Sequence, residues 1–350
     1  MGASASYVWR LATRPAVTRA DAVQRNVLRL FAFLFIGAVL ACAIQRAIDS
    51  GLHRVTTSDF GITNQVVAGR ANAEIVISGS SRALTHYDAQ IIGEATHRRA
   101  LNLGLNGTQT DVQLAFLQAY LRLNAKPALV IHNLDPYAFL TSHEIYDPAK
   151  YLPYLDQPEI FSVVRHVYPQ AWKWRWLPLY GYAVEDMRFT WLIGLQALVG
   201  RQPREDRVLG YQARHTPWTG DFEKFKASNP DGVTLGIEPQ GLKDVAAIAA
   251  LCRQHGVPLV FVYSPEYAEM QAITKNRAEV FAQFTAISAA AGARFWDYSG
   301  SSICQQRDLF YNSQHLNVNG ATAFSRDLAQ RLVQSGLLAK SHAADAGRAD

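Results

Sequence analysis

The sequence predicts an α/β protein with a parallel β-sheet, preceded by a membrane helix and interrupted by a helical, aromatic-rich insertion. From residue 73 onward, short apolar runs alternate with helix-like stretches. This alternation is typical of a parallel sheet that helices cover on both faces. An uncharged apolar run lies near the N-terminus, and five of the seven tryptophans fall between residues 140 and 240.

The composition is that of a folded protein with a large apolar core. The 350 residues are 49% hydrophobic and 18% charged, which argues against a disordered chain and allows one large domain or two small ones. The net charge of +5 is mild, and the sequence has no basic stripe with interleaved aromatic residues. We therefore expect no nucleic-acid partner.

The first predicted element is the apolar run from Leu30 to Ile44, which lies between Arg29 and Arg46. A membrane span needs about 20 residues, and flanking residues extend this run to 30–48 if the two arginines reach toward the headgroups. Residues 1–29 are rich in arginine, so the positive-inside rule predicts that they are cytoplasmic. We expect a single-pass protein of the inner (cytoplasmic) membrane whose C-terminal domain is periplasmic.

Three other interpretations of the apolar run stay open. A signal peptide would be cleaved near Ala41–Ala43, although 29 residues form a long segment ahead of its apolar core. A lipoprotein would be cleaved before Cys42. A buried helix of a soluble protein would have a similar composition.

The rest of the chain divides into a polar connector, a sheet-forming domain and a tail. We predict the connector at 49–72, the domain at 73–340 and a disordered tail at 341–350. The predicted strands are Glu74–Ser78, Ala100–Leu103, Ala128–Asn133, Pro258–Tyr263 and Arg294–Tyr298. The predicted helices are Leu84–Glu94, Thr110–Leu123, Leu242–His255, Lys275–Ala290 and Ala321–Gln334.

Residues 140–240 interrupt the alternation after the third strand and predict a helical insertion or lid. Two interpretations of its aromatic residues stay open. They form a second core layer, because aromatic side chains usually pack together. Alternatively, they form a surface that rests at the membrane interface or holds a sugar or acyl chain.

The segment Glu74–Arg82 (EIVISGSSR) carries the first candidate for chemistry. It is an apolar strand that ends in Gly-Ser-Ser-Arg, and a helical pattern begins at once. Backbone N–H groups converge at such a turn, so Ser81 is a candidate nucleophile beside an oxyanion site. The alternative role of Ser81 is a helix N-cap. We predict that Arg82 lies on the surface.

The segment Phe310–Ala321 (FYNSQHLNVNGA) carries the second candidate. His315 lies in a loop just before another helical pattern, far along the chain from Ser81. A serine and a histidine at separate loop–helix junctions indicate a nucleophile and a base that folding brings together.

At these motifs the chain resembles the SGNH (GDSL-like) hydrolase superfamily. Gly79–Ser81 is similar to the first block of that family, and Asn312–His315 is similar to the last, normally Asp-x-x-His. The resemblance covers roughly residues 73–140 and 240–335. It implies a flavodoxin-like sheet, with Ser81 as the nucleophile and His315 as the base.

The two middle blocks supply the oxyanion donors of the family. Asn102–Thr108 resembles the second block, which implies that Gly107, or alternatively Gly104, donates a backbone N–H group. Ile131–Asp135 occupies the place of the third block, although the usual Gly-x-Asn-Asp is absent. By resemblance, Asn133 would donate its side-chain amide.

Asn312 stands where the family has an acid, and this departure leaves three outcomes open. An amide can orient imidazole but cannot offset a full positive charge. In the first, Ser81 and His315 act as a dyad that Asn312 or a backbone carbonyl orients. In the second, Asp297 or Asp135 supplies the charge, and in the third the site is catalytically retired.

The sequence around His315 is similar to a membrane-anchored SGNH-like subgroup that looks related to proteins that O-acetylate exopolysaccharides such as alginate. The resemblance implies a serine esterase or O-acyltransferase that acts on acyl groups of a cell-envelope or exported glycan. The alternative is a retired SGNH-fold subunit or glycan-binding component of an envelope assembly, with a protein partner.

The sequence predicts no cofactor and no metal. It contains no Walker loop, no G-x-G-x-x-G, no H-E-x-x-H and no paired C-x-x-C. Cys252 and Cys304 form a disulfide if the domain is exported, or they are two ordinary buried thiols.

Overall fold

The protein is an α/β protein whose centre is one five-stranded parallel sheet. The computed structural model describes residues 19–185, 189–204 and 207–338. The strands of the sheet run in the order β2-β1-β3-β6-β7, and every neighbouring pair is parallel. Their bounds are β1 Ile75–Ser78, β2 Ala100–Asn102, β3 Leu129–Asn133, β6 Leu259–Tyr263 and β7 Arg294–Asp297. All five predicted strands are confirmed, and this order is the one found in flavodoxin-like sheets.

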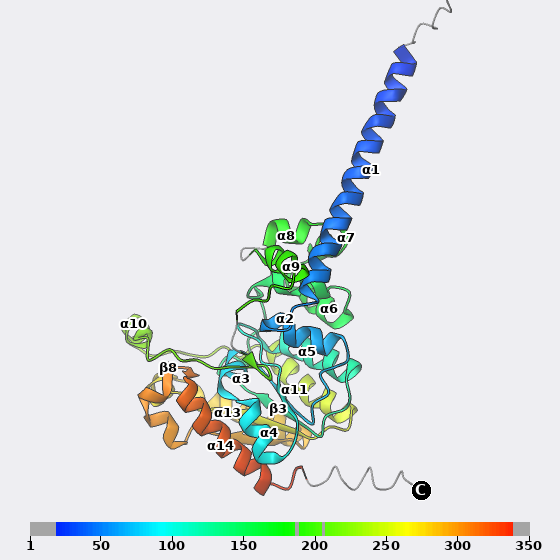
Figure 1. Cartoon of the computed structure of the whole chain (residues 1–350). Coiled ribbons are helices and arrows are strands. Elements are labelled where there is room, and N and C mark those ends of the chain that lie inside the picture. The colour runs from blue at the N-terminus through cyan, green and yellow to red at the C-terminus, as the bar shows by residue number, and fades with distance from the viewer. Residues whose placement is uncertain (1–18, 186–188, 205–206, 339–350) are drawn as a thin grey trace, which may run out of the picture.

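Helices cover both faces of this sheet, as Figure 1 shows. In β1, Val76 packs into the core on one face, and Ile75 and Ile77 pack into the core on the other. A parallel sheet that is buried on both faces requires such continuous apolar strands. The helices of the first face are α5 Thr110–Leu123, α11 Pro239–Gln254 and α13 Arg277–Ala291, and those of the second are α3 Ser81–His86, α4 Ala89–Thr96 and α14 Val318–Gln334.

The helix predicted at Leu84–Glu94 is two helices, α3 and α4. The reason is Asp88, which caps α4 by accepting hydrogen bonds from the backbone N–H groups of Gln90 and Ile91. The other four predicted helices are confirmed with small shifts of their ends. Short elements complete the C-terminal half: α12 Ala268–Ile273, the 3-10 helices η2 Ser302–Gln305 and η3 Arg307–Leu309, and the hairpin of β8 Phe310–Asn312 and β9 His315–Leu316.

Residues 49–72, predicted to be a polar connector, are mostly helical. The N-terminal helix α1 (Arg19–Leu52) runs into this range, and α2 (Ser58–Val67) follows it. The prediction was wrong because apolar side chains of α2, such as Phe60 and Val66, are spaced to face the core and are buried there.

The insertion between β3 and β6 is mainly helical, as predicted. Its elements are η1 Pro148–Tyr154, α6 Pro158–Val167, α7 Ala171–Trp176, α8 Tyr180–Glu185, α9 Thr190–Leu198, β4 Arg207–Val208, β5 Tyr211–Gln212 and α10 Asp221–Ser228. Tyr151, Tyr154 and Trp174 are buried in a third cluster that also contains the end of α1. These residues fit the interpretation as a second core layer, whereas Trp172 and Trp176 are exposed.

Helix α1 projects from the body and is the one helix among the described residues that is long and apolar enough to cross a membrane. Its apolar part is not buried against the body, which argues against a buried helix of a soluble protein. A membrane span and a signal sequence both remain compatible with it. Residues 1–18 of the predicted cytoplasmic segment lie outside the described residues, and so does the predicted tail.

The three cysteines, Cys42, Cys252 and Cys304, are unpaired, and the last two are buried.

Candidate active site

The turn after β1 places Ser81 at the carboxyl end of the sheet. Gly79 makes the turn at a φ of +146°, and a Cβ there would lie 2.8 Å from the Ala83 Cβ and 3.0 Å from the Asn133 Cβ. Ser80 caps α3 by accepting a hydrogen bond from the Arg82 N–H. Because Ser80 is the cap, the hydroxyl of Ser81 is available for another partner.

That partner is His315. The Ser81 Oγ lies 2.8 Å from the His315 Nε2, although the two residues are 234 positions apart in the sequence. On the other side of the ring, the His315 Nδ1 lies 2.9 Å from the Asn312 Oδ1. The structure thus brings together the three residues predicted for the nucleophile, the base and its orienting group.

The contacts of Asn312 determine the protonation of the imidazole. The backbone N–H groups of His315 and Gln314 also donate to the Asn312 Oδ1, at 2.9 and 3.1 Å. Two backbone donors identify this atom as the amide oxygen, so Nδ1 must carry a proton in order to donate to it. The neutral ring then presents an unprotonated Nε2 to the Ser81 hydroxyl, which is the tautomer that a general base requires.

The surroundings of His315 disfavour its cation. Burial, together with the positive charges of Arg82 and Arg214, lowers the pKa of His315 to about 3. The ring of Tyr311 stacks on the imidazole with a centroid distance of 5.3 Å. The imidazole is therefore neutral at physiological pH, and its cation is poorly stabilised.

Neither carboxylate considered from the sequence contacts His315. Asp135 accepts a hydrogen bond from the Asn133 side chain at 2.9 Å, and Asp297 accepts one from the Ser299 N–H at 2.8 Å. Among the described residues, no carboxylate is hydrogen-bonded to the imidazole. The interpretation that Asp297 or Asp135 supplies a negative charge to His315 is therefore wrong.

A pocket opens beside Ser81 and His315, with a cavity volume of about 200 Å³. Gly107 and Thr108 line it, with Tyr137 and Gln314 on other sides. Gly107 adopts a φ of +67°, and a Cβ on it would lie 2.7 Å from the Tyr146 Cβ. This glycine therefore allows the backbone beside the pocket to pass close to Tyr146.

The two glycines considered as oxyanion donors differ in their backbone N–H groups. The Gly104 N–H donates to the Asn102 Oδ1 at 2.8 Å, and a Cβ on Gly104 would collide with the backbone of Leu84. Within the described part of the chain, the Gly107 N–H has no hydrogen-bond acceptor. Gly107 is thus the better placed donor.

Asn133 lies behind the pocket and is 1% exposed. Its Oδ1 accepts a hydrogen bond from the Tyr87 hydroxyl at 2.7 Å, and its Nδ2 donates to Asp135 at 2.9 Å. Asn133 does not line the pocket. One hydrogen of its Nδ2 group is used in the bond to Asp135, so the predicted donation to an oxyanion would need the other hydrogen.

Arg82 was predicted to lie on the surface, and this prediction was wrong, because its side chain is 2% exposed. Its guanidinium donates to the backbone carbonyls of Ser264 and Pro265, just after β6, and stacks 4.5 Å above the Tyr263 ring. These contacts join the nucleophile turn to the end of another strand.

His86 is a second residue that the sequence analysis did not identify. It is fully buried, its Nδ1 lies 2.8 Å from the Ser264 Oγ, and its Nε2 accepts a hydrogen bond from the Leu316 N–H. Burial lowers the pKa of His86, so the ring is neutral. It holds the backbone next to His315, and no signal in the sequence distinguished it from other helix residues.

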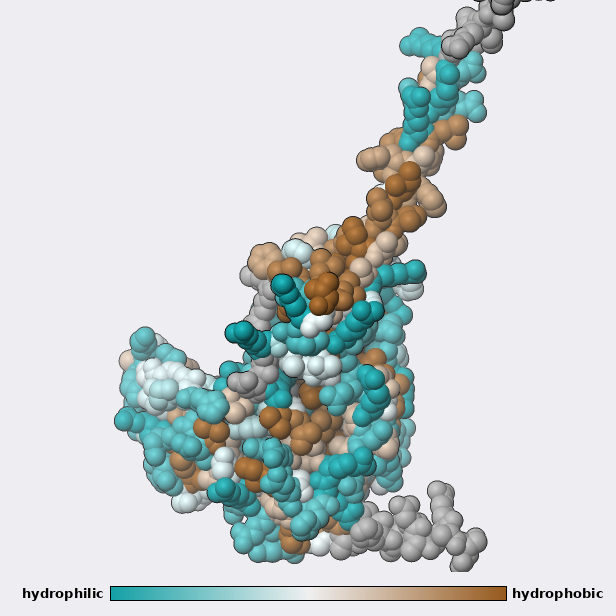
Figure 2. All heavy atoms as spheres, viewed as in Figure 1, coloured by the Kyte–Doolittle hydropathy of each residue, from teal (hydrophilic) through white to brown (hydrophobic). Residues whose placement is uncertain are grey.

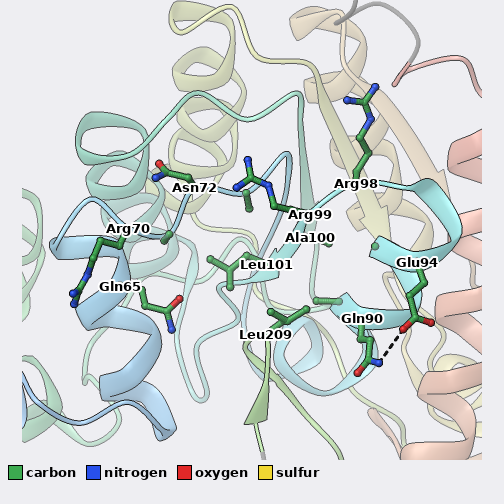
Figure 3. Close-up of a pocket in the computed structure, with 14 residues that line it drawn as sticks. Gln65, Arg70, Asn72, Gln90, Glu94, Arg98, Arg99, Ala100, Leu101 and Leu209 are labelled. Carbon is green, nitrogen blue, oxygen red and sulfur yellow. Dashed lines mark hydrogen bonds between the residues drawn. The ribbon is translucent and has the colours of Figure 1, made fainter.

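A second hollow, of about 310 Å³, lies at the β2 edge of the sheet (Figure 3). Polar side chains such as Gln65, Arg70 and Arg99 surround it, and Gln90 and Glu94 are hydrogen-bonded to each other at its rim. It contains no paired nucleophile and base. The described residues contain no cluster of three or more His, Cys, Asp or Glu that could hold a metal ion.

The fold and site define an α/β protein with a flavodoxin-type strand order and a Ser–His–Asn arrangement at the carboxyl ends of its strands. No family model and no curated protein matches the sequence. Among solved structures, an inhibitor-bound aryl esterase of M. smegmatis is similar, with 12% identity and a TM-score of 0.34. The match covers 74% of this chain and 98% of that chain. This likeness is too weak to assign an activity.

Proposed function

We propose that the protein is a serine esterase or O-acyltransferase of the SGNH type, anchored in the inner membrane by α1. Its substrate would carry acyl groups on a cell-envelope or exported glycan. The observation that carries the proposal is the continuous hydrogen-bonded set of Ser81, His315 and Asn312 beside an open pocket.

The reaction begins when the Ser81 Oγ attacks the carbonyl carbon of the acyl group and passes its proton to the His315 Nε2. The negative charge on the carbonyl oxygen is held by the backbone N–H groups of Ser81 and Gly107, with Asn133 as a predicted third donor. The tetrahedral intermediate then collapses, and the imidazolium returns its proton to the leaving alkoxide. The product is an acyl ester on Ser81.

In the second half of the reaction, a new hydroxyl attacks this ester while His315 removes its proton. The bond between the acyl carbon and the Ser81 Oγ then breaks, and the imidazolium returns the proton to the Ser81 oxygen. Water gives hydrolysis, and a sugar hydroxyl gives transfer of the acyl group. A cavity of about 200 Å³ beside Ser81 has room for a small acyl group such as acetyl. The glycan substrate is inferred from the resemblance of the His315 motif and from the membrane anchor.

A fluorophosphonate probe tests the nucleophile directly, because it forms a covalent bond with activated serine hydroxyls. The full chain in detergent should be labelled, and Ser81→Ala should not be labelled. Ser80→Ala is the matched control, since it removes the neighbouring hydroxyl, which caps α3 and hydrogen-bonds to Asp135, but leaves Ser81 and His315 in place. It should keep the labelling. Equal labelling of native chain and Ser81→Ala would refute the assignment.

One observation favours a second candidate, a retired SGNH-fold subunit of an envelope assembly. Asn312 provides no negative charge, and both charged groups that act on His315 are cations, Arg82 and Arg214. This environment works against the imidazolium that catalysis needs. A chain that binds no fluorophosphonate at all, yet folds normally, would support this candidate.

The proposed topology has a separate test. A reporter that is active only in the periplasm should be active when fused after residue 340. Activity of a cytoplasm-specific reporter at the same position would refute the topology and the envelope substrate with it.

A further inference from the structure

Exposed apolar side chains gather on the part of the body that surrounds α1. Outside α1, most of the exposed large hydrophobic side chains in the described structure lie between residues 172 and 199. They belong to α7, α8, α9 and the ends of these helices. Trp176, Phe189 and Val199 are 67, 61 and 74% exposed. A concentration of this kind marks a binding surface, whereas scattered apolar residues do not.

Contacts with α1 hold this surface next to the C-terminal end of the apolar run. Gly194 of α9 lies so close to Gly51 of α1 that a Cβ on Gly51 would overlap its backbone. Gln45 of α1 accepts a hydrogen bond from the Leu179 N–H at 2.6 Å. In Figures 1 and 2, the hydrophobic surface of α1 continues onto the body near α8 and α9, and hydrophilic residues border it.

The length of the apolar run gives a reason for this arrangement. The run of residues 30–44 rises about 1.5 Å per residue, or roughly 22 Å in total. The hydrocarbon core of a bilayer is about 30 Å thick. The predicted span of 30–48 makes up this difference with residues 45–48, but these residues already contact the body. Gln45 accepts a hydrogen bond from the Leu179 N–H, and Ile48 packs against Gly194. The body surface at this contact therefore lies at the edge of the hydrocarbon layer.

The residue types on the surface suit lipid headgroups. The Arg175 guanidinium lies 5.1 Å from the centre of the Trp176 ring, and the Lys173 ammonium lies 5.8 Å from that of Trp172. Tryptophan beside lysine or arginine is typical of membrane–water interfaces, where rings and aliphatic stems stay in the apolar layer and charges reach the headgroups.

We propose that the exposed face of α7, α8 and α9 is a second membrane contact, inserted into the interfacial layer of the bilayer that α1 crosses. The occupant is lipid because this face is continuous with the lipid-facing surface of α1. The domain would then be held against the membrane in one orientation instead of swinging on a tether. The inference rests on the proposed membrane anchoring.

The test uses an environment-sensitive fluorophore (NBD) on single cysteines in the full chain, reconstituted in phosphatidylcholine vesicles that contain brominated phosphatidylcholine. Cys42 is replaced by alanine, and the buried Cys252 and Cys304 remain. The labelled position is Val199→Cys. The matched control is Val333→Cys, which is also exposed, at 56%, but lies on α14 at the other end of the body (Figure 1).

A third label, at Ile36→Cys in α1, reports on the anchor itself. We expect bromine to quench the labels at positions 36 and 199 at least threefold more than the label at 333, and aqueous iodide to quench the label at 333 most. Lipid quenching at 36 with none at 199 would overturn the second contact and leave the anchor intact. No lipid quenching at 36 would refute both. Fluorophosphonate labelling in detergent tests the proposed chemistry independently of either result.

Discussion

Replacing Asn312 with aspartate tests the chemistry of the site most directly. All three hydrogen bonds at this side chain are accepted by the Oδ1 atom. An aspartate can therefore keep the three donors and the orientation of His315, and it adds a negative charge. When a triad loses its carboxylate, it usually loses both a negative charge and the group that orients the histidine. Asn312→Asp changes the charge and keeps the orientation, so it measures the effect of the charge alone.

The expected size of the effect follows from the distance between the charges. A carboxylate at this position would lie about 4 Å from the centre of the imidazolium. At an effective dielectric constant near 20, the attraction is about 4 kcal/mol, which corresponds to roughly three pKa units. The pKa of His315, which burial and the two arginines lower to about 3, would then rise to about 6.

The same attraction stabilises the imidazolium that forms in the transition state. Its upper limit is a factor of about 10³ in rate, and screening by solvent in the open pocket reduces it. We expect Asn312→Asp to hydrolyse p-nitrophenyl acetate about 100-fold faster than the native chain. The rate of the native chain should be independent of pH between 5 and 7, because the base is already neutral there. The rate of the variant should fall below about pH 6 as its base becomes protonated.

Two controls accompany this assay. Ser81→Ala in the Asn312→Asp background should abolish the gain, and Asn312→Ala should be slower than the native chain because it loses the acceptor that orients the ring. The reasoning is refuted if Asn312→Asp folds normally but shows neither a faster rate nor a new acidic limb. That result would favour the retired subunit, since no other carboxylate contacts His315 among the described residues.

Three further predictions concern the pocket, the helix contact and stability. Gly107→Ala places a Cβ against Tyr146 at a positive φ and should lower the esterase rate at least tenfold if this N–H is an oxyanion donor; an unchanged rate would exclude it. Gly194→Val should lower the free energy of unfolding by about 1–3 kcal/mol in a urea titration, because its Cβ would meet the Ile48 carbonyl at 2.5 Å. Gly37→Ala, which has open space, should be neutral, and equal effects would contradict the close helix packing. Burial lowers the pKa of His132 to about 3, so the unfolded chain binds more protons below pH 6.5. Stability should fall by roughly 2 kcal/mol for this residue between pH 7 and pH 5, and His132→Gln should reduce that pH dependence.

The sheet was predictable from the sequence because its strands are short, apolar and separated by helices. Four of the five strands are buried throughout, so a continuous run such as Ile75–Ser78 has few alternatives, whereas the edge strand β7 is partly exposed. The connector was less predictable. Helix α2 is buried or half-buried along its whole length, and its buried residues include the polar Ser58, Thr63 and Asn64. These polar residues hid the apolar contacts of Phe60 and Val66, which lie in two different core clusters. Asp88 gave no strong signal either, since the same residue is common on exposed helix surfaces.

The main residues of the site were predictable because their positions follow from the fold. Ser81 follows a strand that ends at the carboxyl edge, and His315 precedes a helix that begins at that edge. The orientation of the Asn312 oxygen could not be predicted. It depends on two backbone N–H groups of the tight β8–β9 hairpin, and hairpin geometry is not encoded in the residue type of Asn312 alone.

The electrostatic character of the site depends on contacts between distant segments, and this explains why the prediction for Arg82 failed. An arginine after a serine turn is usually exposed, because burying a charge is costly unless polar groups surround it. Here the carbonyls of Ser264 and Pro265, 182 and 183 residues further along the chain, accept hydrogen bonds from Nη2, and the acidic Glu266 and Asp135 favour the charge. The burial of His315 lowers its own pKa, and the charge that Arg82 brings to the sheet edge adds to this effect. The strength of the base is therefore a property of the assembled sheet edge, and a motif of four residues such as Gly-Ser-Ser-Arg cannot determine it.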